Sequence, residues 1–310
     1  IYCGANASPT ITKCVISNSV GTSQGGGMYC GNSAAPTVSH CTFTGNYASS
    51  GAGIFCYYNS SPSISHCTIE DGNAPSAGGG VYCYTGASPS IAFCTIANNW
   101  TGGGGGGIRC DYDTTPTISH SIFQGNMADS CGGGIDGGLG NDLTITDCII
   151  VENTAPFGGG VICNADANVS LINCTIADNE ATGVVGGGGA YGEGEKLTVT
   201  NCIFRNNSST YKGGAMVNAS FPGSCVPVIT NCVFYGNTAN EYGGAMVNSN
   251  DGAVCRPEIT NCVFWNNGAG KSHPDIHDQY APNPVITYCN IQQGYVGTGI
   301  IHLDPLFADP

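Results

Sequence analysis

Positively charged side chains are scarce in this sequence. Only seven of the 310 residues are Lys or Arg, against 21 Asp and Glu, which gives a formal net charge of −14 at pH 7. The seven cations are scattered along the chain, so they cannot form the basic patch whose phosphate contacts supply most of the affinity for nucleic acids. The composition excludes nucleic acid as an expected partner. It also disfavours anionic glycans and membranes unless a divalent cation bridges the two surfaces.

Long apolar runs and leucine are also scarce. No apolar stretch is long enough to span a bilayer, so we expect no transmembrane segment. Six leucines are too few for a leucine-rich repeat. The 49 glycines follow no Gly-X-Y period, which excludes collagen, and a charged fraction of 9% excludes a highly charged disordered chain. We therefore expect a folded chain of another class.

Cysteine, in contrast, is abundant and periodic. Ten of the 19 cysteines recur at intervals of 26 to 30 residues once Ser121 is placed in the same register. This cysteine column consists of Cys14, Cys41, Cys67, Cys94, Ser121, Cys148, Cys174, Cys202, Cys232, Cys262 and Cys289. A period that persists from one end to the other indicates a solenoid, so we expect residues 1–310 to form one elongated domain.

One repeat contains three short strand-like runs separated by turn residues, as in PTVSHCTFTGN (36–46) followed by GAGIFC (51–56). In all eleven repeats an aliphatic residue stands three positions before the cysteine column, and Ile or Phe stands two positions after it. Alternation with polar residues places both columns inside. The sequence predicts an all-β, single-stranded, right-handed parallel β-helix of about eleven coils of about 27 residues, with three short strands per coil.

Two polar columns are predicted at the turns. Asparagine follows the cysteine column by five positions in eight repeats, where it could adopt the left-handed conformation and bond to its neighbour on the next coil. The residue before the cysteine is His40, His66 or His120 in three repeats and asparagine in four others. We interpret this second column as a polar bend. The alternative is that His40 and His66 chelate a metal ion.

Most cysteines are expected to be stacked, buried thiols, because parallel side chains in register resist the dihedral angle of a disulfide. Cys225 and Cys255 differ, since each precedes its column cysteine by seven residues in a repeat lengthened to 30. They occupy matching loops on adjacent coils, where the backbone can adjust. A disulfide between them is therefore a candidate.

Short motifs in the repeats carry a family resemblance. GGAM (213–216 and 243–246) alternates with FRNN (204–207), FYGN (234–237) and FWNN (264–267). This pattern resembles the GGA-[ILVM] and FxxN repeats of the chlamydial polymorphic outer membrane proteins and of wider right-handed, pectate-lyase-like β-helix proteins of bacteria. The resemblance implies a secreted or cell-surface bacterial protein and an adhesin role, but it implies no chemistry.

The first residues are already in register, because Tyr2 and Cys3 match Tyr29 and Cys30 one period later, and the chain starts at Ile1. We therefore expect a segment or processed part of a longer, exported chain.

An outward-facing aromatic column contains Tyr29, Phe55 and Tyr82. An exposed column of rings at the spacing of the coils could stack on sugar rings or on another protein, and these three are our candidate ligand contacts. The alternative is a ladder of like neighbours that only stabilises the fold.

Arg109 and Asp136 interrupt the aromatic column, and Asp111 and Asp113 lie beside them. This group would be similar to polysaccharide lyases of this fold, which use acidic residues to hold calcium and an Arg or Lys as base. Arg109 and Asp136 are therefore the candidate catalytic residues, and Asp111, Asp113 and Asp136 are the candidate calcium ligands. Beyond calcium, no cofactor is expected. The alternative is that these charges only neutralise each other.

The sequence favours a non-enzymatic extracellular β-helix that acts as an adhesin or a structural element, with a glycan or a host-cell surface as partner. Because no capping helix is evident, the coils could also stack end to end into filaments. The alternative function is a polysaccharide lyase or hydrolase that cleaves an extracellular glycan.

Overall fold

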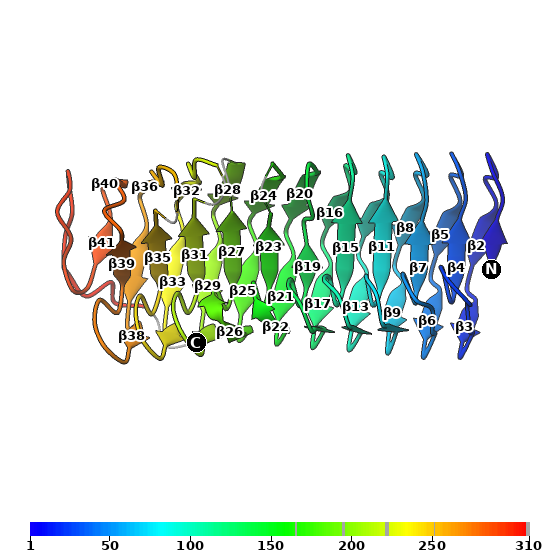
Figure 1. Ribbon diagram of the computed structural model, residues 1–310, viewed down its shortest axis with the longest axis horizontal. Helices are drawn as coiled ribbons and strands as arrows, with labels where there is room; N and C mark the ends of the chain where they lie inside the picture. Colours follow the sequence, from blue (N-terminus) through cyan, green and yellow to red (C-terminus); the bar gives the residue numbers. More distant parts are fainter. Residues whose placement is uncertain (165, 194–195, 221–222, 251, 308–310) are drawn as a thin grey trace.

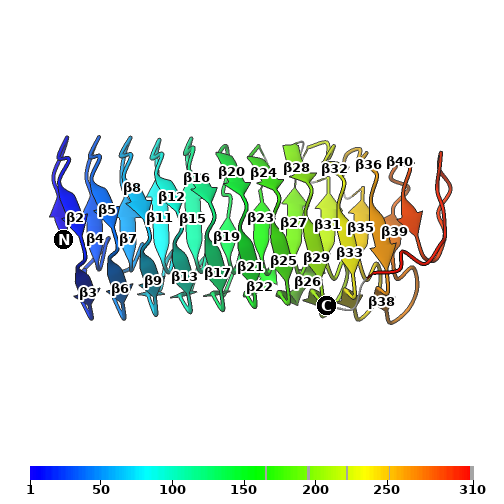
Figure 2. The ribbon, with the colours of Figure 1, turned by 180° about the vertical axis from the view of Figure 1, so that it is seen from behind.

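The chain forms an elongated stack of β-coils (Figure 1). The computed structural model describes residues 1–164, 166–193, 196–220, 223–250 and 252–307. Within these ranges, every regular element is a β-strand, and no helix has the length and apolarity needed to cross a bilayer. Successive coils lie side by side along the long axis, as the opposite view in Figure 2 also shows. The predicted solenoid is confirmed.

Three parallel sheets of eleven strands run the length of the stack, and a fourth sheet has eight. Sheet A contains β1 (Tyr2–Cys3), β4 (Met28–Cys30), β7 (Ile54–Cys56), β11 (Val81–Tyr84), β15 (Ile108–Asp111), β19 (Ile135–Asp136), β23 (Val161–Cys163), β27 (Ala190–Glu193), β31 (Met216–Ala219), β35 (Met246–Ser249) and β39 (Ile276–Gln279). Sheet B contains β2 (Thr10–Thr12), β5 (Thr37–Ser39), β8 (Ser63–Ser65), β12 (Ser90–Ala92), β16 (Thr117–Ser119), β20 (Asp142–Thr146), β24 (Asn168–Ile172), β28 (Lys196–Thr200), β32 (Val228–Thr230), β36 (Glu258–Thr260) and β40 (Val285–Thr287).

The remaining strands form the third long sheet and the short fourth one. Sheet C contains β3 (Val15–Ser17), β6 (Thr42–Thr44), β9 (Thr68–Glu70), β13 (Thr95–Ala97), β17 (Ile122–Gln124), β21 (Ile149–Val151), β25 (Thr175–Ala177), β29 (Ile203–Arg205), β33 (Val233–Tyr235), β37 (Val263–Trp265) and β41 (Asn290–Ile291). Sheet D contains β10 (Asn73–Ala74), β14 (Trp100–Thr101), β18 (Met127–Ala128), β22 (Thr154–Phe157), β26 (Glu180–Gly186), β30 (Ser208–Ser209), β34 (Thr238–Ala239) and β38 (Gly268–Ala269). Sheet D adds a fourth short strand to many coils, which the sequence did not predict.

Apolar residues at the centres of the strands in sheets B and C stack into two interior columns that share one core. In sheet B, Ile11 pairs with Val38 and Val38 with Ile64. In sheet C, Phe234 stacks on Phe264 with ring centroids 4.6 Å apart and nearly parallel planes. These side chains belong to one continuous core cluster. Each coil therefore covers the apolar face of the next, because no coil can bury its own.

The turn between sheets B and C explains why cysteine recurs. The residue before the cysteine column has a left-handed φ between 48° and 56° in all eleven coils. The sulfur then bonds the backbone of two coils: Cys67 Sγ accepts from Cys41 N at 3.4 Å and donates to Ser65 O at 3.2 Å. Ser121 Oγ makes the equivalent pair of bonds, with Cys94 N at 3.1 Å and Ser119 O at 2.8 Å. Serine can replace cysteine here because the position needs a small side chain that both donates and accepts.

The asparagine column forms a buried ladder, in which one side chain hydrogen-bonds to the asparagine at the same position of the next coil. Asn126 Nδ2 donates to Ile96 O at 2.9 Å and to Asn153 Oδ1 at 3.0 Å, and Asn153 Oδ1 also accepts from Asn126 N at 2.9 Å. The expectation that these asparagines adopt the left-handed conformation is wrong. The preceding residue does so instead, as at Asn98 (φ 53°) and Gly125 (φ 62°). The chain bends at the residue before each ladder asparagine, which is the more exposed of the two. The asparagine side chain can then point inward.

The glycine runs that precede sheet A have a steric cause. Gly78 has a φ of 59°, where a side chain would be strained, and a Cβ at Gly80 would lie 2.6 Å from the carbonyl oxygen of Gly107 on the next coil. The first glycine therefore supplies a bend, and the later one allows close approach of adjacent coils. The GGG and GGA motifs encode this corner of the coil.

Residues 292–303 cover the last full coil. Thr298 and Ile301 form parallel bridges with Thr287 and Asn290 of that coil. Tyr295 and Ile300 pack against the end of the hydrophobic core. The backbone edge of the last full coil is therefore partly paired by residues 292–303.

Candidate functional site

The residues predicted to carry chemistry lie on adjacent strands of sheet A. Tyr82 of β11 pairs with Arg109 of β15, which pairs in turn with Asp136 of β19. Cys83 and Cys110, the next residues along β11 and β15, belong to the buried core. Because side chains alternate along a strand, Tyr82, Arg109 and Asp136 point outward from the coil. The structure therefore brings the predicted catalytic pair together.

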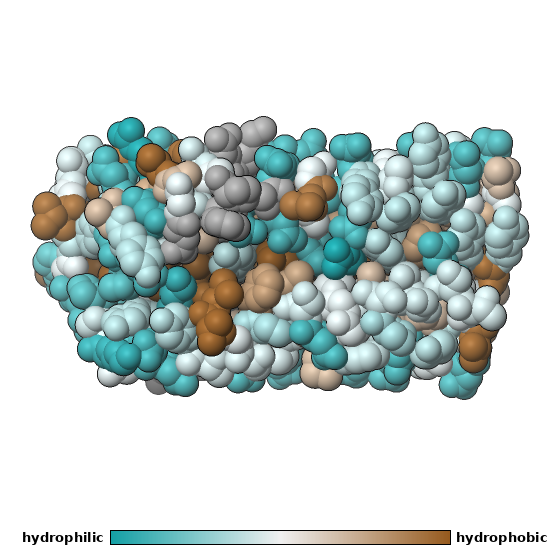
Figure 3. All heavy atoms as spheres, in the orientation of Figure 1, coloured by the Kyte–Doolittle hydropathy of each residue, from teal (hydrophilic) through white to brown (hydrophobic). Residues whose placement is uncertain are grey.

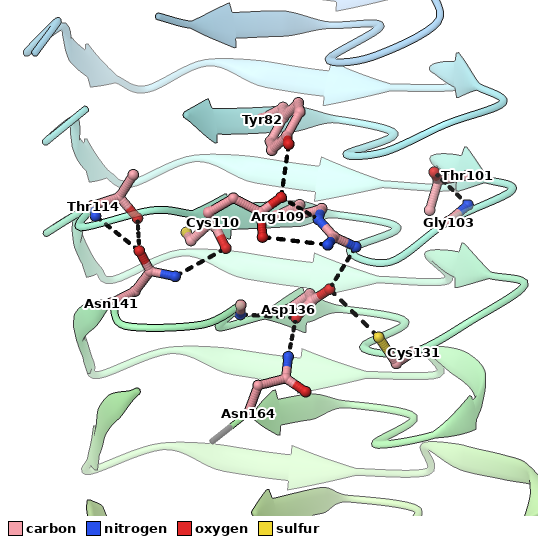
Figure 4. Close-up of polar contacts among 12 residues, drawn as sticks. Tyr82, Thr101, Gly103, Arg109, Cys110, Thr114, Cys131, Asp136, Asn141 and Asn164 are labelled. Atoms are coloured by element: carbon pink, nitrogen blue, oxygen red, sulfur yellow. Dashed lines mark hydrogen bonds and ion pairs between the residues drawn. The ribbon is translucent and has the colours of Figure 1, made fainter. Parts of the chain in front are cut away.

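Arg109 bridges two carboxylates (Figure 4). Its Nε lies 2.7 Å from Asp111 Oδ2, its Nη2 donates to Asp111 Oδ1 at 3.3 Å, and its Nη1 lies 3.1 Å from Asp136 Oδ2. The Tyr82 hydroxyl donates to the same Asp111 Oδ2 at 2.7 Å. The guanidinium thus occupies the space between the acidic groups and neutralises much of their charge.

Asp136 is completely buried at the floor of this group. Its Oδ1 accepts from Gly138 N at 2.9 Å and from Asn164 Nδ2 at 2.8 Å, and its Oδ2 accepts from Cys131 Sγ at 3.5 Å. Burial raises the pKa of Asp136, while Arg109 and the Gly138 amide oppose this rise. Both oxygens of the carboxylate therefore have protein partners.

The arrangement does not supply the base that the lyase interpretation requires. Burial would lower the pKa of Arg109, but Asp136 and Asp111 outweigh this effect and hold the pKa above its ordinary value. A base must be able to lose its proton before it accepts one from a substrate, and a guanidinium between two carboxylates does not. The ion-pair interpretation fits the geometry better than the catalytic one.

The predicted calcium ligands do not converge. Asp113 is exposed and has a left-handed φ of 59°, whereas Asp111 and Asp136 direct oxygens at Arg109. Calcium needs six or more oxygen ligands around an open centre, and here a cation from the protein fills that centre. Across the described ranges, no group of three or more His, Cys, Asp or Glu side chains is arranged to hold a metal ion. The residues present do not fit the calcium site.

Of the three predicted aromatic contacts, only Tyr29 is partly exposed. Tyr29 stacks on Phe55 with ring centroids 5.6 Å apart, but Phe55 has no exposed surface and Tyr82 is only 9% exposed. Tyr57 and Tyr84 pack against them and cover them. The expectation that Phe55 and Tyr82 face solvent is therefore wrong, because neighbouring tyrosines pack against them.

Three further rings on this side were not predicted from the sequence: Tyr57 and Tyr84, which are partly buried, and Tyr112, which is exposed. Tyr57 and Tyr84 stack in parallel, with centroids 6.2 Å apart and planes 7° apart. Tyr29 lies 6.1 Å from Tyr57, and Tyr112, which is 55% exposed, meets Tyr84 edge-on at 5.3 Å. We call Tyr29, Tyr57, Tyr84 and Tyr112 the tyrosine face. Its sequence signal is an aromatic residue directly after Cys56 and Cys83, which places Tyr57 and Tyr84 on the same side as the outward column.

The histidines at the bend form a stacked column. His40 and His66 lie 4.9 Å apart with planes 4° apart, and Phe93 continues the stack to His120. All four have left-handed φ values. The bend interpretation is confirmed by this geometry. Face-to-face rings hold their nitrogens in parallel planes, which does not favour chelation.

Cys225 and Cys255 lie in register on adjacent coils, but both are free thiols in the structure. A hydrogen bond with the Cys255 thiol and burial raise the pKa of Cys225. In the structure the pair is therefore held as two neighbouring thiols. We expect the mass of the intact protein to be unchanged by a reducing agent, and both residues to be alkylated after unfolding without reductant. A gain of two hydrogen masses on reduction, mapped to this pair, would contradict the free-thiol assignment.

Comparison with known proteins identifies the fold but no individual relative. A family model described as a right-handed β-helix region matches residues 1–161 and 106–302. No curated protein matches the chain, and no solved structure does. The two matches together span most of the eleven coils, in agreement with the observed sheets.

Proposed function

The chain belongs to the right-handed β-helix family, and from this premise we propose that it is a non-catalytic binding protein that holds a neutral glycan chain on its tyrosine face. The observation that carries the proposal is the row of partly exposed tyrosines on successive coils, whose rings contact one another face to face or edge to face. Aromatic faces suit the apolar faces of sugar rings, and a row along the solenoid axis suits an extended chain.

Buried aromatic rings pack against the tyrosine face and hold its side chains in place, so a ligand can bind with little loss of side-chain conformational entropy. Phe55 and Tyr82 form a buried layer beneath the exposed rings, and Tyr82 is fixed by its hydrogen bond to Asp111. Rings that are held in place before binding lose little rotamer freedom when a ligand docks. A preformed platform of this kind needs no conformational change.

Charge favours a neutral glycan over an acidic one. The protein has a formal net charge of −14, and Arg109, the cation nearest the tyrosine face, is already paired with Asp111 and Asp136. An anionic polysaccharide would meet repulsion without a free cation to offset it. Figure 3 shows that one long side of the solenoid is largely hydrophilic to neutral, with separate hydrophobic spots, which suits a polar, uncharged polymer.

We place this activity on an exported, surface-exposed bacterial protein. The GGAM and FxxN motifs resemble those of the chlamydial polymorphic outer membrane proteins, and this resemblance supports an adhesin role. An adhesin that engages glycans on a host or a neighbouring cell fits the tyrosine face. We prefer it to a filament subunit, because the tyrosine contacts lie on successive coils along the side of the stack and not at an end.

Binding of the whole chain to a glycan panel tests the proposal. The panel contains neutral polysaccharides (xylan, mannan, β-glucan, cellulose and chitin) and acidic ones (pectate and alginate). We expect binding to at least one neutral glycan, and about a tenfold loss of affinity in each of Tyr57→Ala and Tyr84→Ala, since one aromatic contact is worth roughly a decade. Tyr280→Ala is the matched control, because Tyr280 is 66% exposed but lies outside the tyrosine face.

Two results would overturn the proposal. One is the absence of binding to every neutral glycan in the panel. The other is unchanged affinity in the double variant Tyr57→Ala/Tyr84→Ala. Release of shorter oligosaccharides from any glycan, with or without calcium, would instead support the lyase or hydrolase.

A further inference from the structure

Two histidines far from the tyrosine face meet near the C-terminal end of sheet A. His277 lies in β39, and His273 lies just before this strand. The ring of His277 stacks on Tyr242 of the preceding coil with centroids 4.7 Å apart and planes 17° apart. His273 has a left-handed φ of 57°, so the chain bends there and directs the two imidazoles toward each other. Tyr242 thus fixes one ring, and the bend positions the other.

The separation of the two ring nitrogens is informative. His273 Nδ1 and His277 Nδ1 are 3.3 Å apart and are joined by a hydrogen bond, slightly longer than the usual 2.7–3.2 Å, which a bound metal ion would replace. Two Zn–N bonds of about 2.0–2.1 Å at a tetrahedral angle would separate their nitrogens by roughly 3.3–3.4 Å. A right angle, as in square-planar copper, would give only about 2.9 Å. The observed distance matches the tetrahedral geometry.

We propose that His273 and His277 form a two-imidazole site for Zn²⁺, with water completing the coordination. His273 is exposed and His277 is partly exposed, so a metal ion can reach both from solvent. The Ser272 hydroxyl hydrogen-bonds to His273 Nδ1 at 2.8 Å, so a metal ion bound to this nitrogen would replace that contact. Two protein ligands leave open positions, as in zinc sites that bind a further ligand. Nothing in the family match assigns a metal to this chain.

The groups around His277 favour its neutral form, which is the form that binds metal. Burial and the neighbouring His273 lower the pKa of His277, and Lys212 adds to this effect while Asp278 opposes it. Lys271 is paired with Glu241 at 2.6 Å, and Asp278 accepts hydrogen bonds from Asn248 and Tyr295. Zinc binds only neutral imidazole, so the affinity for zinc is expected to fall in acid, where the imidazoles are protonated.

The chain contains a matched comparison in His40 and His66. These two rings also lie on adjacent elements, with centroids 4.9 Å apart, but they stack face to face. Their lone pairs lie in parallel planes and do not converge on one point. His40 and His66 are close but not oriented to share a metal ion, so this pair is the control for nonspecific binding of zinc to histidine.

Zinc titration of the whole protein, followed by calorimetry, tests the site. We expect saturable binding near pH 7.5 that is lost, by at least tenfold in affinity, in His273→Gln and in His277→Gln. His40→Gln/His66→Gln should retain the wild-type affinity. Cobalt serves as a spectroscopic probe: the site should give the visible absorption of tetrahedral cobalt without a thiolate charge-transfer band, which separates it from the 19 cysteines. Circular dichroism of each variant checks the fold, and His273→Gln changes an exposed side chain.

The outcomes are distinct. Loss of zinc binding in His273→Gln with retention in His40→Gln/His66→Gln would support the site. Equal binding by wild type and His273→Gln, binding that shows thiolate charge transfer, or no binding by the folded wild type would overturn it. None of these results depends on the glycan proposal, because Tyr57 and Tyr84 lie on other coils.

Discussion

Replacing Asn153 by alanine is expected to lower the free energy of unfolding by about 2–5 kcal/mol. The substitution removes the acceptor of Asn126 N and the donor to Phe123 O, and both of these backbone groups are inside the ladder. A buried polar group left without a partner costs about 1–3 kcal/mol, and two are left here. Asn126 Nδ2 keeps its bond to Ile96 O, so it adds little to the loss.

Chemical denaturation of wild type and variant measures this effect. Asn240→Ala is the control, because Asn240 is exposed and an exposed substitution is expected to change stability by less than about 0.5 kcal/mol. A solenoid is stabilised by contacts between neighbouring coils, so the loss could appear as early unfolding of the coils around residue 153. Equal stability of Asn153→Ala and Asn240→Ala would contradict the ladder.

Replacing Arg109 by methionine is expected to cost about 3–5 kcal/mol at pH 7, because it leaves Asp136 buried without its cation. Burial already raises the pKa of Asp136, and loss of Arg109 removes an opposing influence. A carboxyl whose pKa is higher in the folded chain than in the unfolded chain stabilises the fold at low pH, and this contribution is lost as the pH rises through the folded value. The stability deficit of Arg109→Met should therefore be smaller at pH 4 than at pH 7.

Arg205→Met is the matched control for this prediction. Arg205 pairs with Asp178 at 3.4 Å, but both side chains are more than one third exposed. Exposed ion pairs contribute about 0–1 kcal/mol, so this variant should lose little at either pH. A deficit of Arg109→Met that matches Arg205→Met, or that grows toward pH 4, would show that the buried ion pair does not have the proposed role.

The sequence predicted the core well because its signal repeats on every coil. The column that contains Val38 and Ile64 and the column that contains Phe234 and Phe264 are visible from period alone, and the structure buries all four residues. Sheet D was missed for the opposite reason. Strands of two residues, such as β10 and β14, are too short to show the alternation that identifies a strand.

The sequence predicted which residues of the candidate site are neighbours but not which contacts their side chains make. Register alone placed Tyr82, Arg109 and Asp136 on neighbouring strands, and the structure confirms this pairing. Register does not determine how far a side chain reaches, so the sequence could not choose between a calcium site and an ion pair. The burial of Phe55 depends on the tyrosines around it, which is a property of three dimensions and not of the period.

Hydrogen bonds between side chains at the same position of adjacent coils, such as Asn126 and Asn153, hold the stack together. A double-mutant cycle on these two residues tests such contacts most directly. Because Asn126 N and Nδ2 both donate to Asn153 Oδ1, we predict that the effects of Asn126→Ala and Asn153→Ala on the free energy of unfolding are coupled by about 1–3 kcal/mol. Effects that add within about 0.3–0.5 kcal/mol, as for residues that are not in contact, would contradict the stacked coils.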